Sequence, residues 1–180
     1  MHPAFRSGGN APYPAPVRQL TGAGLCALLC VLGGRLIRKK WEDQLKETLL
    51  FQDALQSLFR EMRFSGRGLA ALFMACAPDE HHYFFRLGRE MASHPAAPPD
   101  ELLQALPPPA LLSPALQKAL EKLLFGLMLP EETWQQKTLE ETLLFWKEET
   151  LALQAYLSQK GPLITQLSLY LGCALFILLC

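Results

Sequence analysis

The sequence has very few β-branched apolar residues: two valines and three isoleucines occur among its 180 residues. Aromatic residues make up only 9% of the chain, although half of it is hydrophobic. Strands favour β-branched and aromatic side chains, so this composition argues against a β-sheet. The leucine-rich remainder predicts an all-α fold.

Acidic residues are absent before Glu42 and after Glu149. The segment 41–160 holds all 17 acidic residues and 11 basic ones, a net charge of −6. The remaining six basic residues all precede Trp41. Nucleic-acid binding requires clustered lysines and arginines on the folded part of a protein. The acidic centre therefore argues against a nucleic-acid partner.

Signatures of catalysis and of cofactor binding are also missing. The five cysteines match no disulfide framework, so we expect reduced thiols. There is no phosphate-binding G-x-x-x-x-G-K-[ST] motif and no G-x-S-x-G motif. His81 and His82 are adjacent, about 100° apart on a helix, and do not readily share one metal ion. We expect surface histidines, no enzymatic activity, no cofactor and no small-molecule substrate.

Two long apolar runs predict membrane spans. Residues 20–37 contain one charge, Arg35, whose side chain can reach the lipid headgroups, and residues 162–180 contain none. A span needs about 20 mostly apolar residues, so both runs qualify as transmembrane helices. The alternative of a cleaved signal peptide fits the first run less well, because it continues into a basic, helical sequence without a small-x-small site.

The basic residues that flank these runs predict the orientation. Arg35 lies at the end of the first run, three more follow it and one precedes the second run, whereas only Arg6 and Arg18 precede the first. The positive-inside rule then places the centre in the cytoplasm and both termini outside a cell membrane. The residues expected at the membrane interface are Arg35, Arg38, Lys39, Lys40 and Lys160.

Between the runs, residues 38–160 predict a cytoplasmic antiparallel helical bundle. Before the first run, residues 1–19 predict a disordered tail. We expect a helix from Trp41 that ends at SGRG (65–68), and a long last helix from Pro130 whose Trp, Phe and Leu stripe is mostly core. Gly161-Pro162 should mark its junction with the second span. The long first and last helices should lie antiparallel.

The shorter central helices are delimited by prolines and caps. We expect one at 69–77, one at 79–93 with Asp79 as its N-cap, and one that Ser113-Pro114 starts and that runs to Leu127. The proline-rich stretch 95–114 predicts a flexible or stiff linker with at most one short helix, at about 100–106.

Two regions are candidates for a partner surface. The last cytoplasmic helix carries acidic pairs at helical spacing, which we expect on one polar face. The other region surrounds the break at 65–69. The candidate partner-binding residues are Glu61, Gly66, Leu69, Glu140, Glu141, Glu148 and Glu149.

Four segments resemble the stage III sporulation protein AB family of endospore-forming bacteria. They are GLCALLCVLGGRLIRKK at 24–40, LQSLFREMRFSGRGLAALF at 55–73, Gln135-Gln136-Lys137 after Gly126, and SQKGPLITQLSLYLGCALFILL at 158–179. The proline-rich stretch, the spacing from Gly126 to Gln135 and the tail depart from the family's pattern.

The resemblance implies a membrane subunit of the secretion-like channel complex between mother cell and forespore. Its cytoplasmic domain would resemble the helical domain of type II secretion and type IV pilus platform proteins. The implied partners are the cytosolic sporulation ATPase and other membrane subunits of the complex. The alternatives are a platform-type subunit of a pilus or secretion system, a membrane-bound hydrolase using His81 and His82, and an unrelated membrane-anchored adaptor or tail-anchored regulator.

Overall fold

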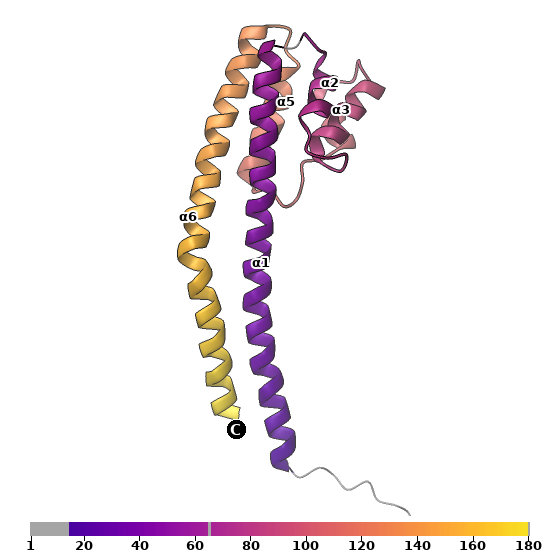
Figure 1. Cartoon of the computed structure of the whole chain (residues 1–180). Helices are drawn as coiled ribbons and strands as arrows, with labels where there is room; N and C mark the ends of the chain where they lie inside the picture. Colours follow the sequence, from indigo (N-terminus) through magenta and orange to yellow (C-terminus); the bar gives the residue numbers. More distant parts are fainter. Residues whose placement is uncertain (1–14, 65, 180) are drawn as a thin grey trace, which may run out of the picture. The chain divides into compact units, whose positions relative to one another are not determined.

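The computed structural model describes residues 15–64 and 66–179, and their side chains at 24, 25, 28–64 and 66–178. These residues form α-helices and no strand, so the predicted all-α class is confirmed for them. The helices are α1 (Ala15–Phe64), α2 (Leu69–Cys76), α3 (Tyr83–Ser93), α4 (Pro99–Ala105), α5 (Pro114–Leu127) and α6 (Glu132–Leu179) (Figure 1).

The described residues divide into two compact units. Residues 15–39 of α1 and 160–179 of α6 form the first, which we call the helix-pair unit. Residues 40–159 form the second, the bundle unit, which contains α2 to α5 and the remaining parts of α1 and α6.

In the helix-pair unit the two helices are antiparallel and pack closely at one point. A Cβ added to Gly34 would collide with the Ser168 hydroxyl and lie 2.6 Å from the Ser168 Cβ. Further along, Leu28 and Val31 face Cys173 and Phe176 across an apolar cavity of about 550 Å³. Small residues at a crossing are typical of paired membrane helices, because they let the backbones approach.

Among the described residues, α6 is the helix long and apolar enough to cross a membrane, by length and composition. At Gly161-Pro162, the predicted junction with the second span, α6 continues as one helix. Proline at position 162 removes one helical hydrogen bond to the residue 158 carbonyl, yet the surrounding turns remain helical. The span predicted at 20–37 lies within α1, and several of its side chains lie outside the described residues.

The tail was predicted at 1–19, but α1 begins at Ala15, so residues 15–19 belong to a helix. Residues 1–14 lie outside the described part of the chain. From Arg35 to Phe64 no glycine or proline interrupts α1, which ends at the predicted break.

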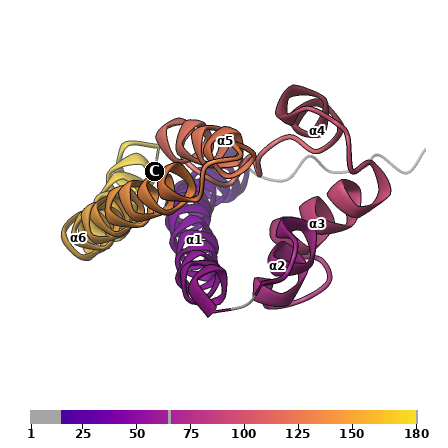
Figure 2. The same cartoon turned by 90° about the horizontal axis from the view of Figure 1, so that it is seen from above.

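In the bundle unit α1 and α6 are antiparallel, as predicted. Trp41 contacts Tyr156, with ring centroids 5.0 Å apart, and Thr48 contacts Trp146. Viewed along the helices, α5 packs beside α1 and α6, whereas α2, α3 and α4 lie on the opposite side of α1 from α6 (Figure 2).

An aromatic cluster around Phe51 forms the centre of the bundle core. The Phe51 ring stacks on Trp146 from α6, with centroids 5.6 Å apart, and meets Phe84 of α3 edge-on at 5.3 Å. The indole nitrogen of Trp146 donates a hydrogen bond of 3.0 Å to the Thr48 carbonyl. One phenylalanine of α1 therefore joins three helices that are far apart in the sequence.

The proline-rich stretch is not a flexible linker, which corrects the sequence prediction. Leu102, Leu106 and Leu112 are buried in the core. The Tyr83 hydroxyl donates a hydrogen bond of 3.1 Å to the Leu106 carbonyl, and the Gln117 amide donates to the Pro109 carbonyl at 3.0 Å. The prolines restrict the backbone, while the leucines between them anchor the stretch to the bundle.

The cap of α3 also differs from the prediction. The helix begins at Tyr83, and the His82 Nδ1 accepts from the Phe84 amide at 3.3 Å, so His82 is its N-cap. Asp79 instead accepts from the His81 and His82 amides at 2.8 and 2.7 Å and caps the preceding turn. The boundaries of α2 and α5 agree with the prediction within one residue. The Ser113 hydroxyl caps α5 by accepting a hydrogen bond from the Leu116 amide.

Candidate functional site

The bundle unit has a cavity of about 540 Å³ where α1 ends and α6 begins, which we call the tip pocket. Five structural elements border it: the end of α1, the 66–68 turn, the start of α2, the end of α5 and the start of α6. The lining residues are Met62, Arg63, Phe64, Gly66, Arg67, Leu69, Leu72, Leu127, Glu132, Gln135 and Gln136.

The exposed surface of the tip pocket is mostly polar, and its floor borders the core. Leu72 and Leu127 belong to the buried core, and Met62 and Leu69 are half-buried beside them. The break at 66–68 ends α1 and turns the chain into α2, so that α2 and the end of α5 reach the same cavity. The core leucines at its floor remain buried, at 5% exposed for Leu72 and 1% for Leu127.

The rim of the tip pocket is polar and carries two exposed arginines. The Arg63 guanidinium lies over the Phe59 ring, 5.7 Å from its centroid. Within the described part of the chain, neither Arg63 nor Arg67 forms an ion pair. On the α6 side, the Gln135 amide donates a 2.6 Å hydrogen bond to the Leu129 carbonyl and is thereby fixed in place.

Phe64 stands on the same rim with 86% of its surface exposed. Exposed aromatic side chains at the edge of a concave surface are typical of protein interfaces, where they supply much of the binding free energy. The exposed Phe64 ring can contact an apolar group, and the polar lining of the pocket can bind an anionic or polar one.

Of the predicted partner residues, Gly66 and Leu69 line the tip pocket. Glu61 does not. It is exposed on α1, and its charge adds to burial in raising the pKa of the Cys76 thiol to about 11. The structure therefore brings two of these three residues together.

Three of the four glutamates predicted on one polar face of the last helix are exposed, namely Glu140, Glu141 and Glu148, whereas Glu149 is partly buried. At about 100° per residue, Glu141 and Glu148 point in similar directions, whereas Glu140 and Glu149 point to opposite sides of them. Glu149 is half-buried, next to Leu116 and Tyr156 at another cavity. Adjacent acidic residues cannot occupy a single helical stripe.

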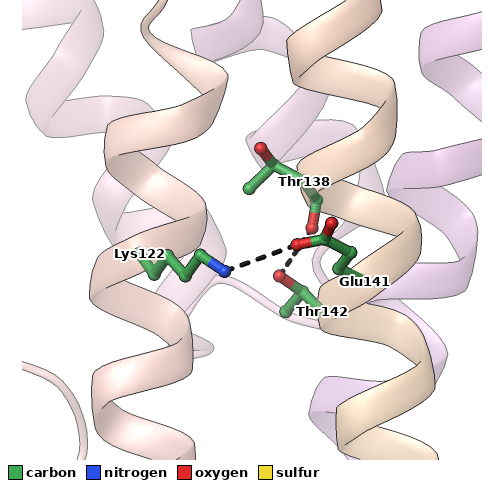
Figure 3. A network of polar contacts seen from close by, with 4 residues as sticks. All are labelled: Lys122, Thr138, Glu141 and Thr142. Carbon is green, nitrogen blue, oxygen red and sulfur yellow. Dashed lines mark hydrogen bonds and ion pairs between the residues drawn. The ribbon is translucent and has the colours of Figure 1, made fainter.

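Glu141 contacts α5 rather than projecting freely. The Lys122 ammonium lies 3.4 Å from its carboxylate (Figure 3). Both side chains are more than half exposed, so the pair contributes little to stability. Nearby, Thr138 packs against Gly126 of α5, and the Thr142 hydroxyl donates 2.7 Å to the Thr138 carbonyl (Figure 3).

Sequence reasoning missed the residues that give the tip pocket its chemistry. The predicted break at 65–68 follows Arg63 and Phe64 and contains Arg67. Three arginines within eight residues beside a helix end could have indicated a binding surface. It also placed Trp134 in the core stripe, although half of this side chain is exposed beside Lys137. The sequence analysis also did not identify Leu144 and Leu151 as exposed residues of α6.

The surface position expected for His81, His82 and His94 is wrong for His82. This residue is 6% exposed and packs against the Phe51 ring, 4.6 Å away, and burial lowers its pKa despite the nearby Asp79. Its Nε2 has no hydrogen-bond partner. In the part of the chain that the structure describes, no three His, Cys, Asp or Glu side chains are placed to hold a metal ion.

The cations predicted at the membrane interface are all exposed, namely Arg35, Arg38, Lys39, Lys40 and Lys160. Cys30, Cys76 and Cys173 are free thiols, as expected.

Comparisons with protein-family models, with curated proteins and with solved structures found no match for this chain.

Proposed function

We propose that this protein is a non-enzymatic membrane scaffold whose bundle unit docks a cytosolic protein at the tip pocket. The observation that carries the proposal is the pocket itself. It combines a mostly polar concave surface, an aromatic side chain that is 86% exposed, and two arginines without an ion-pair partner in the described chain. These are properties of a docking surface, and Gly66 and Leu69 were expected at such a surface from the sequence.

The membrane part of the proposal is supported by α6, which is long and apolar enough to span a bilayer. The second proposed span is the segment of α1 that packs closely against α6 in the helix-pair unit. The exposed basic residues between Arg35 and Lys40, together with Lys160, favour a cytoplasmic bundle unit.

The resemblance to the stage III sporulation protein AB family gives the proposal its biological setting. The protein would belong to the secretion-like channel complex in the mother-cell membrane around the forespore. Its cytosolic partner would be the ATPase of that complex, and the two spans would lie beside other membrane subunits.

A co-flotation experiment tests the docking function. The full chain is reconstituted in liposomes, and binding of the purified sporulation ATPase is measured by flotation. We expect the ATPase to float with the wild type and with Phe125→Ser, whose side chain is 42% exposed outside the pocket. Phe64→Ser should reduce binding by about tenfold, because the exposed aromatic anchor is lost. No flotation with the wild type would contradict the choice of partner.

Cysteine labelling tests the orientation. In a cysteine-free background, a single cysteine at the exposed position 89 is treated with a membrane-impermeant maleimide. The proposal requires labelling only after the cells are permeabilised. Labelling in intact cells would place the bundle unit outside and rule out a cytosolic partner.

A further inference from the structure

The helix-pair unit carries positive charge and no negative charge, since all 17 acidic residues of the chain lie outside it. Arg35 and Lys39 are exposed, one turn apart on α1, and neither forms an ion pair with a described residue. Arg38, between them, has a contact of its own. The acid nearest to Arg35 in sequence is Glu42, two turns away, and Asp43 lies one turn beyond Lys39. The unit itself therefore supplies no counter-ion for these two cations.

An apolar groove lies between the two helices of the same unit. Leu28 and Val31 line it from α1, and Leu169, Cys173 and Phe176 from α6, around a volume of about 550 Å³. The groove is open at its side, because Leu28 is 57% and Leu169 is 53% exposed. In a bilayer it faces lipid tails, which are as apolar as leucine, so the groove accepts an acyl chain but does not by itself select one lipid.

The two cations stand on the side of α1 that lines this groove. Gly34 faces α6 where the two helices cross. At about 100° per residue, Val31 and Leu28 lie roughly 60° and 120° from that direction. Arg35 and Lys39 lie roughly 100° and 140° from it, on the same side, and Arg35 follows Val31 by about 6 Å along the helix axis. A ligand in the groove can therefore extend to both cations.

The cations select the headgroup of such a ligand. A guanidinium binds a phosphate group through two parallel hydrogen bonds, and an ammonium binds it as a point charge. A phospholipid joins a phosphate to its acyl chains, so a single molecule reaches the cations and the groove together. A zwitterionic headgroup also carries a positive charge, which Arg35 and Lys39 repel. A headgroup with net negative charge is therefore favoured.

Resting on the membrane part of the proposed function, we propose that the groove of the helix-pair unit is a binding site for an anionic phospholipid. The phosphate binds Arg35 and Lys39, and one acyl chain lies along Leu28, Val31 and Phe176. The site faces the membrane leaflet next to the bundle unit, which is the cytoplasmic leaflet in the proposed orientation.

Native mass spectrometry tests the site. The full chain in a non-ionic detergent is titrated with phosphatidylglycerol and with phosphatidylcholine of identical acyl chains. We expect the first phosphatidylglycerol to bind at least about fivefold more tightly, which is the gain from one basic side chain at a membrane surface. Equal affinities would overturn the inference.

The same spectra distinguish the other occupants of the groove. Inorganic phosphate and glycerol 3-phosphate carry the anion without acyl chains. If either displaces phosphatidylglycerol at matched ionic strength, the cations bind free phosphate and the lipid site is wrong. A two-chain species that excludes the lipid would overturn the inference in favour of a second copy of the chain.

A matched pair of charge removals locates the headgroup. Arg35→Gln/Lys39→Gln should weaken phosphatidylglycerol binding by about fivefold or more and leave phosphatidylcholine binding unchanged. Lys40→Gln/Lys160→Gln removes equal charge from exposed positions and should cost about twofold at most. At about 100° per residue, Lys40 lies on the side of α1 away from the groove, and Lys160 on the side of α6 away from it. Equal losses would show a diffuse charge effect and overturn the inference.

A matched pair of apolar substitutions locates the acyl chain. Val31→Phe adds volume inside the groove and should weaken the binding of both lipids by about fivefold, with the preference between them retained. Leu25→Phe adds a ring at a position that is 63% exposed outside the groove lining, and it should change neither affinity. If Val31→Phe binds phosphatidylglycerol as tightly as the wild type, the acyl chain does not occupy the groove and the inference is wrong.

The inference and the proposed docking function fail separately. If the two lipids bind equally but the ATPase floats with the wild type, only the lipid site is wrong. If phosphatidylglycerol is preferred but the ATPase does not float, the lipid site stands and the choice of partner is wrong. A chain that does not itself float with the liposomes would overturn both.

Discussion

Trp146 should be the most sensitive single position in the bundle unit. It is fully buried, its ring stacks on Phe51, and its indole nitrogen bonds the Thr48 carbonyl. Replacement by alanine removes a large buried ring, which costs about 3–5 kcal/mol in protein cores. We therefore expect Trp146→Ala to lower the free energy of unfolding by this amount, a large share of the 5–15 kcal/mol typical of a domain.

Trp146→Phe separates the two contributions. Phenylalanine keeps an aromatic ring beside Phe51 but loses the hydrogen bond to the Thr48 carbonyl, worth about 1 kcal/mol net. The volume lost with the second ring adds a cavity cost of roughly 1 kcal/mol. The expected decrease is about 2 kcal/mol. Trp134→Phe is the control, since Trp134 is half exposed, and it should change stability by less than about 0.5 kcal/mol.

Cys76 provides an assay that reports on the bundle unit alone. Its thiol is 7% exposed, and a pKa of about 11 keeps it protonated, so it should react with alkylating agents only when the unit opens. In a chain whose other cysteines are replaced, alkylation of Cys76 is measured as a function of urea concentration. If Trp146→Phe shifts the midpoint no more than Trp134→Phe, the packing argument is refuted.

The other predictions use the same assay or a distance measurement. Burial lowers the pKa of His82 in the folded state, so the stability that its neutral form contributes is fully present above about pH 6.5 and is lost as the pH falls below that value. His82→Asn should therefore flatten the dependence of the unfolding free energy on pH below about pH 6.5. Gly88→Ala should cost about 1–3 kcal/mol, because its Cβ would lie 2.6 Å from a backbone carbonyl of α2, whereas Gly68→Ala should be nearly neutral, since a Cβ there meets open space. Gly34→Leu should separate the two helices of the helix-pair unit, which is measured as the distance between spin labels placed on each helix. Gly33→Leu is the control and should leave this distance unchanged, because a side chain at position 33 meets open space.

Local sequence signals predicted much of the helical framework correctly. Ser113-Pro114 predicted the start of α5, the glycines at 66 and 68 predicted the end of α1, and the scarcity of valine and isoleucine predicted the absence of strands in the described chain. Each of these features depends on a few neighbouring residues, which restrict the backbone directly or satisfy the free amides at a helix end. The one wrong cap, Asp79, failed because a short polar side chain can cap a turn or a helix equally well.

Only the tertiary structure decided which faces of the helices are covered and where the tip pocket forms. Prolines at 95–114 predicted a linker, but Leu102, Leu106 and Leu112 among them are buried in the core. His82 became a buried cap because Phe51, 31 positions earlier, packs over its ring. The tip pocket needs α1, α2, α5 and α6 at one place, and no window of sequence contains all four. Burial is a property of contacts between distant segments, so the sequence of one helix determines that the helix forms but not what covers it.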